Sequence, residues 1–151
     1  MLMALCVLLA HAQKKGGAGS QTVDATQVPD SVKVVQAHDF PGIIVTKWEL
    51  HSGKNPKKGS HYTAQFTDAS GARMHARYQQ NGSVVSHSTY YDSAHLPAVV
   101  ATAAKRYPGY TVTGAERIEG IKKLRTRYEV KLKGDAGKKT VKLDDQGNEF
   151  K

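Results

Sequence analysis

The sequence predicts an α+β protein built from two tandem αβββ repeats, in which an antiparallel sheet carries its helices on one face. Three observations lead to this fold. The same residue types recur in the same order in both halves of the 151-residue chain. Each half opens with a helical apolar stripe that a Pro-Gly pair ends. Each half then continues with segments in which apolar and polar residues alternate.

The internal repeat is clearest in the turn residues and the acidic residues. Pro41-Gly42 recurs as Pro108-Gly109, 67 positions later, and Glu49 recurs as Glu116 at the same offset. Strands that begin with tyrosine and turns that contain glycine repeat in the same order: Tyr62 and Tyr128, Gly71 and Gly137, Asn81-Gly82 and Gln146-Gly147. Agreement of this extent indicates two copies of one structural unit.

A helix is expected at the start of each copy. In the second copy Leu96, Val100, Ala103 and Tyr107 fall on one helical face. The corresponding stripe of the first copy is Val28, Val32 and Val35. A proline follows the first residue of each stripe, Pro29 after Val28 and Pro97 after Leu96. At the start of a helix its missing N–H is harmless, and the Pro-Gly pair ends each helix. We expect Tyr107, together with Tyr128 on a later strand, to be buried between helix and sheet.

Three strands are predicted after each helix, at about 43–50, 61–67 and 72–79, and then at about 110–118, 124–133 and 138–144. The segment 124–133 alternates apolar with mostly cationic residues, so one face packs on a helix and the other meets solvent. Short links that contain glycine predict antiparallel hairpins. Trp48 is assigned to the core of the first unit, with an exposed interface anchor as the alternative.

The chain divides into four predicted segments: a signal peptide at 1–12, a flexible linker at 13–27, a first unit at 28–91 and a second unit at 92–151. An apolar run, Leu2 to Ala10, precedes the small-x-small pattern Ala10-His11-Ala12, which predicts cleavage after Ala12. A buried N-terminal strand is the alternative. The run is shorter than the roughly 20 residues that cross a bilayer. We therefore expect a periplasmic or secreted protein without membrane insertion after cleavage.

The repeat resembles the PepSY-like family, and within it the β-lactamase-inhibitor-like (BLIP-like) branch of small exported bacterial proteins. The residues that carry the resemblance are the two helix stops, Phe40-Pro41-Gly42 and Tyr107-Pro108-Gly109, with the late glutamates, the tyrosine-led strands and the closing glycine turns. It covers roughly residues 28–150. The resemblance implies a curved sheet, no enzymatic activity, and an association with inhibiting or chaperoning hydrolases, but no particular site residue.

Catalytic and metal sites find little support in the sequence. The single cysteine, Cys6, lies in the predicted signal peptide, and no G-x-S-x-G or H-E-x-x-H motif occurs. His51 and His61 flank one loop, but two imidazoles alone hold a metal weakly. Glu49 and Glu116 occupy matching repeat positions, and we expect each to pair with a nearby cation. No catalytic, cofactor-binding or metal-binding residue is therefore assigned, and a small hydrolase is the least favoured function.

A cationic sheet face is the candidate site, in a chain that carries a net charge of +9. Its expected members are Arg125, Arg127, Lys131 and Lys133, with Arg73 and Arg77 from the first copy. The leading hypothesis is a non-catalytic exported binding module that docks an acidic protein or an anionic polymer. The alternatives are a structural or envelope-stress protein that binds polyanionic cell-surface material, and a merely solvated face. Nucleic acid is not expected, because few aromatic residues interleave with the cations.

Overall fold

The computed structural model describes residues 19–52, 59–121 and 125–150, and it confirms the predicted α+β class. One antiparallel sheet contains eight strands in the order β1-β2-β3-β4-β5-β6-β7-β8, so each strand pairs with its neighbours in sequence. The strands are β1 (Ser20–Val23), β2 (Lys47–His51), β3 (His61–Thr67), β4 (Arg73–Gln79), β5 (Val84–Asp92), β6 (Tyr110–Gly120), β7 (Arg125–Gly134) and β8 (Gly137–Asp144). The predicted signal peptide lies outside the described residues.

Two α-helices, α1 (Asp30–Asp39) and α2 (Ala98–Ala104), open the two repeats as predicted. A proline, Pro29 or Pro97, precedes the first residue of each helix with an extended backbone. After each helix the chain reverses at a glycine with positive φ, at +74° in Gly42 and at +82° in Gly109, a conformation that side chains with Cβ rarely adopt. Within the described residues, no helix has the length and apolar character needed to cross a membrane.

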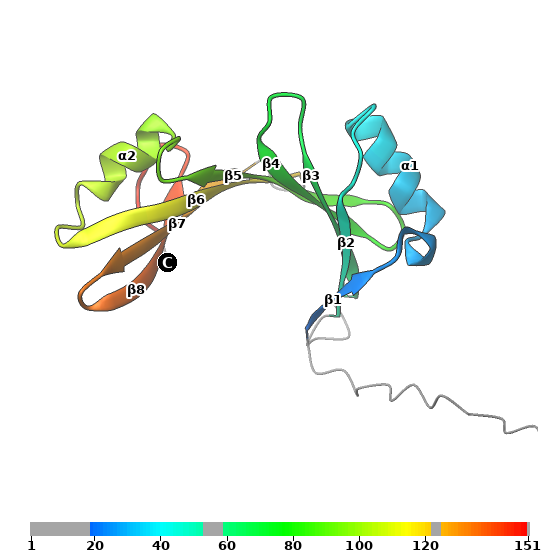
Figure 1. Cartoon of the computed structure of the whole chain (residues 1–151), viewed down its shortest axis with the longest axis horizontal. Helices are drawn as coiled ribbons and strands as arrows, with labels where there is room; N and C mark the ends of the chain where they lie inside the picture. The colour runs from blue at the N-terminus through cyan, green and yellow to red at the C-terminus, as the bar shows by residue number, and fades with distance from the viewer. Residues whose placement is uncertain (1–18, 53–58, 122–124, 151) are drawn as a thin grey trace, which may run out of the picture.

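The sheet bends into an arch, and both helices cover its outer, convex face (Figure 1). Separate apolar clusters fill the space beneath the two helices, one for each repeat. Under α1 the buried residues are Val28, Val32, Trp48, Tyr62, Ala64, Phe66, Ala76 and Tyr78. Under α2 they are Val100, Ala103, Val112, Ala115, Tyr128, Val130, Leu132, Val141 and Leu143. The core assignment of Trp48, 7% exposed, and of Tyr128, 8% exposed, is confirmed.

Tyr107 differs from the prediction, because it is only partly buried at the edge of the second cluster. Its hydroxyl donates a hydrogen bond to Glu149 Oε2 at 2.6 Å, and the Lys139 ammonium stands 4.8 Å from the centre of its ring. Helix α2 ends at Ala104, before the predicted stop, so the tyrosine lies in the following turns rather than on the helix. The aromatic residue before Pro-Gly therefore closes the end of the cluster and does not fill its centre.

Two further strands were not predicted. A flexible linker was expected at 13–27, but β1 and a short 3₁₀ turn, η1 (Ala25–Gln27), occupy the described part of that segment. Asp24 caps the turn, accepting a hydrogen bond from Thr26 N at 2.9 Å, and β1 pairs with β2. β5 joins the two repeats by pairing with β4 on one side and β6 on the other. A single continuous sheet results.

Candidate functional site

The inner, concave face of the sheet carries the side chains that alternate with the core residues. Each strand directs every second residue toward the helices, so the intervening residues project into the hollow beneath the arch. All six cations of the predicted site lie on this face and so share one side of the sheet: Arg73, Arg77, Arg125, Arg127, Lys131 and Lys133. They form two groups, on β4 and on β7, three strand spacings or roughly 14 Å apart.

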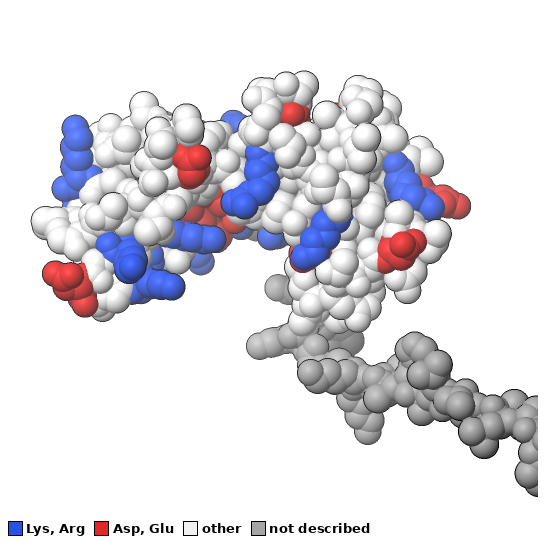
Figure 2. All heavy atoms as spheres, viewed as in Figure 1, with Lys and Arg blue, Asp and Glu red and all other residues white. Residues whose placement is uncertain are grey.

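The basic flank is the part of the inner face formed by β7 and β8: Arg125, Arg127, Lys131, Lys133, Lys138 and Lys142. All are exposed except Arg127, which is half-buried. Glu129 lies among them, with its Oε1 3.6 Å from Arg127 Nε, and it stands opposite Lys142 in the strand register. Lys and Arg side chains gather on the underside of the limb formed by β7 and β8 (Figure 2).

A polar floor extends across β3, β4, β5 and β6 at the centre of the inner face. Its buried members are Thr63 and Ser88, each 1% exposed, with Ser86 at 6% and Glu116 at 9%. Four atoms here are buried without a hydrogen-bond partner: Thr63 Oγ1, Arg77 Nε, Ser88 Oγ and Glu116 Oε1. Buried polar groups in folded proteins are nearly always hydrogen-bonded, so such a concentration calls for an explanation.

Tyr90 and His75 link the floor to its neighbours on β4. The Tyr90 hydroxyl lies 2.9 Å from His75 Nδ1, and the two rings pack with their centres 4.5 Å apart. The guanidinium of Arg73 stands over the Tyr90 ring at 4.9 Å, an arrangement that favours the cation. Burial, and then the negative charge of Glu116, raise the pKa of Tyr90 well above its ordinary value. The phenol is therefore neutral and acts as a hydrogen-bonding group.

Glu49 and Glu116 differ in their partners, although they occupy matching repeat positions. Glu49 pairs with Lys47 at 2.6 Å as expected, and this hydrogen bond is the main reason that its pKa is lowered. The expectation of an ion pair was wrong for Glu116, which has none within 4 Å among the described residues. The two carboxylates lie on strands four spacings apart, roughly 19 Å along the sheet, so they do not form a dyad.

His51 and His61 stand opposite each other on β2 and β3, and their rings stack. The ring centres are 4.7 Å apart and the planes differ by 2°. His51 Nε2 also lies 3.4 Å from Glu49 Oε2. Both histidines are half-buried at the ends of strands. In the part of the chain that the structure describes, no group of three or more His, Cys, Asp or Glu residues is arranged to hold a metal ion.

The half-buried histidines make stability depend on pH. Burial is the main cause of the lowered pKa values of His61, His75 and His87. Unfolded imidazoles titrate near pH 6.5, so below that pH the unfolded chain binds protons that the folded chain does not. We therefore expect the urea midpoint to fall between about pH 7.5 and about pH 5.5, a range above the titration of ordinary carboxyls.

A triple variant provides the control for this measurement. The triple variant His61→Gln, His75→Gln, His87→Gln should lose less stability across the same pH interval, because the proton uptake of these groups is removed from both states. Equal urea midpoints for the wild-type chain at both ends of the interval would contradict the expectation.

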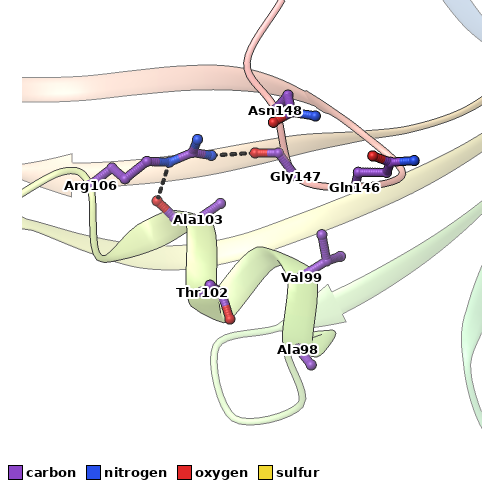
Figure 3. Close-up of a pocket in the computed structure, with 8 residues that line it drawn as sticks. All are labelled: Ala98, Val99, Thr102, Ala103, Arg106, Gln146, Gly147 and Asn148. Carbon is purple, nitrogen blue, oxygen red and sulfur yellow. Dashed lines mark hydrogen bonds between the residues drawn. The ribbon is translucent and has the colours of Figure 1, made fainter.

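A hollow on the outer face, of about 470 Å³, lies between α2 and the turn after β8. Figure 3 shows Arg106 reaching across it, where the guanidinium donates hydrogen bonds to the carbonyl oxygens of Ala103 and Gly147. Gly147 packs against Val99, where an added Cβ would come within 2.9 Å of Val99 Cγ2. Arg106 thus fastens the helix to the turn, and we assign this hollow a structural role.

Comparison with known proteins identifies relatives of the fold but does not assign the chain to a family. A scan against protein-family models finds no match to the sequence, and a search of the curated proteins finds none either. Among solved structures, a BLIP-like protein from Bacteroides fragilis matches with a TM-score of 0.65 and 19% identity, over 82% of this chain and 84% of that chain. A DUF2874 family protein from Bacteroides ovatus matches with a TM-score of 0.63 and 18% identity over the same shares.

A third solved structure comes from Bacteroides eggerthii, and its name provisionally assigns that protein to the periplasm. It matches with a TM-score of 0.64 and 14% identity, over 82% of this chain and 86% of that chain. At such identities the likeness is one of fold. The chain therefore shares the fold of these BLIP-like and DUF2874 structures, and its membership of the PepSY-like family stays a prediction.

Proposed function

We propose that this chain is a non-catalytic exported module that binds an acidic partner protein on the inner face of its sheet. The observation that carries the proposal is the basic flank, where six cations face two carboxylates, Glu129 and Asp144, on one side of β7 and β8. Such a concentration of charge attracts acidic partners and speeds their encounter. The arched sheet, concave on this side, suits a convex partner surface (Figure 1).

Export is supported by two separate observations. The apolar run at Leu2–Ala10 with its Ala10-His11-Ala12 pattern is typical of a signal peptide. A solved structure of the same fold bears a name that refers to the periplasm. More specifically, we propose that the chain inhibits or chaperones an envelope or secreted hydrolase. This more specific role rests on the family resemblance.

The second candidate function is a structural or envelope-stress protein that holds polyanionic cell-surface material. The exposed cations of the basic flank also suit this function, because anionic polymers bind through charge alone. The two candidates differ in selectivity. A protein-docking module should prefer an acidic polypeptide, such as poly-L-glutamate, over dextran sulfate of the same length. A polymer-binding protein should bind both, with the more densely charged dextran sulfate bound more tightly.

The basic flank is tested by changing Arg125, Arg127, Lys131 and Lys133 to Gln together. We expect affinity for poly-L-glutamate to fall about tenfold at low salt and its salt dependence to flatten, because exposed charges act through a screened field. The fold should persist, since surface substitutions rarely change stability by more than about 0.5 kcal/mol each. Fluorescence anisotropy at about 50 mM and about 300 mM salt measures both quantities.

The matched control removes four cations from the outer face: Lys33, Lys105, Arg117 and Lys139, each changed to Gln. Both variants carry the same net charge, but they have lost it from opposite faces of the sheet. The control should keep most of the affinity for poly-L-glutamate. Equal losses in the two variants would show that net charge, and not the inner face, determines binding. Circular dichroism establishes that both variants are folded before binding is compared.

A further inference from the structure

Arg77, on the inner face of the sheet, has no opposite charge beside it among the described residues. It is half-buried on β4, directly across from Thr63 on β3 and Ser86 on β5. Among the described residues no carboxylate lies within 4 Å of its guanidinium, and Arg77 donates no hydrogen bond. A guanidinium keeps its charge in folded proteins, so this arrangement is costly in the free chain.

The other arginines show how unusual this is. Arg117 and Arg127 each pair with a glutamate, at 2.8 Å and 3.6 Å. Arg73 lies over an aromatic ring, Arg106 donates to backbone carbonyl oxygens, and Arg125 is exposed to solvent. Arg77 alone in the described part of the chain combines partial burial with the lack of any acceptor. Its Nε is buried without a hydrogen-bond partner, whereas the residue as a whole is only half-buried, so part of the side chain is open to a partner.

The surroundings of Arg77 favour a polypeptide as the source of the missing acceptor. His61 and His75 lie near Arg77: burial is the main cause of their lowered pKa values, and the positive charge of Arg77 contributes to the lowering. The floor beside it also contains the carboxylates of Glu49 and Glu116, which repel a densely charged polyanion. A polypeptide brings N–H donors for these carboxylates together with a carboxylate for Arg77.

We propose that Arg77 is the anchor that receives one carboxylate side chain of the acidic partner, in a two-pronged pairing at the centre of the inner face. A planar guanidinium matches a carboxylate with two parallel hydrogen bonds, which a lysine ammonium does not reproduce. This inference rests on the proposed function, since it names the contact that the docked protein makes. The basic flank then attracts the partner, and Arg77 fixes its position.

The first test compares three single variants for binding poly-L-glutamate. Arg77→Gln should weaken binding about tenfold, and Arg77→Lys should weaken it several-fold although the charge is kept. Arg73→Gln removes one inner-face charge from the same strand and should weaken binding by no more than about twofold. Equal effects of Arg77→Gln and Arg73→Gln, or an unchanged affinity of Arg77→Lys, would overturn the anchor but leave the proposed function standing.

The second test observes the side chain directly. In a ¹H–¹⁵N spectrum the Arg77 Nε–H signal, assigned by its loss in Arg77→Gln, should shift as poly-L-glutamate saturates the wild-type chain. A signal that stays in place at saturation would overturn the anchor. Failure of the wild-type chain to bind poly-L-glutamate at low salt would instead overturn the proposed function and the anchor with it.

A stability measurement guards against a misfolded variant. Because Arg77 is partly buried without an acceptor, Arg77→Gln should have a urea midpoint equal to or above that of the wild-type chain. Lower binding in a variant that is equally or more stable supports a role in docking. A large fall in the midpoint would contradict the view that this guanidinium has no structural partner.

Discussion

Replacing Tyr78 by alanine is expected to lower the free energy of unfolding by about 3–5 kcal/mol, whereas Tyr78→Phe should leave it unchanged or raise it. Tyr78 is fully buried in the cluster under α1. Truncation to alanine removes a large apolar surface and opens a cavity. The hydroxyl, however, has no hydrogen-bond partner, so its removal relieves a desolvation cost.

Urea unfolding of the three proteins at about pH 7.5 measures the contrast. A small domain has a total stability of roughly 5–15 kcal/mol, so the alanine variant should be largely unfolded or close to it. A clear loss of stability in Tyr78→Phe would show that the hydroxyl makes a stabilising interaction. A midpoint of Tyr78→Ala near that of the wild-type chain would contradict the packing of the first cluster.

The sequence was sufficient for the elements that local chemistry determines. The Pro-Gly pairs marked the ends of both helix regions, because few backbone conformations follow such a pair. Strand β7 was predicted almost to its ends, since its apolar and charged residues alternate strictly. The cationic face followed from the same alternation, because a period of two fixes which side chains share a face.

Strand β5 was missed because its pattern is not that of a half-buried strand. It carries Ser86 and Ser88 on the inner face and His87 on the outer face, so polar residues occur on both sides. This composition reflects its place between the two apolar clusters, where the His87 ring packs against Phe40 at 4.9 Å. Its valines, threonine and tyrosines favour a strand, but polar residues on both faces conceal the alternation by which the other strands were predicted.

The polar floor could not be predicted, because its residues meet only through the strand register. Thr63, Arg77 and Ser86 lie side by side in a row across β3, β4 and β5. The register shift between Arg77 and Tyr78 helps to set that row, and no sequence motif marks it. The surroundings of Glu116 could not be predicted either. The repeat relates Glu116 to Glu49, but Glu49 has a lysine partner and Glu116 has none among the described residues.

Glycine turns contact both helices on the outer face. Substituting such a glycine is the second change that we expect to lower stability strongly. Gly82, in the turn after β4, has a φ of +84°, and a Cβ added there would lie 2.7 Å from the carbonyl oxygen of Ser31 in α1. Ser31 Oγ donates a hydrogen bond to Gln80 O at 3.0 Å in the same contact. Gly71 provides a comparison, with a φ of +85° but no atom within 4 Å of the added Cβ.

We expect Gly71→Ala to destabilise the protein by about 1–2 kcal/mol, the cost of a side chain in the left-handed region. Gly82→Ala should cost a further 1–3 kcal/mol or so, because the new methyl group must displace the backbone of α1. Urea unfolding of both variants measures the difference, and equal losses would show that the turn does not press on the helix. Since α1 packs against β4, the strand that carries Arg77, Gly82→Ala should also weaken binding of poly-L-glutamate, whereas Gly71→Ala should not.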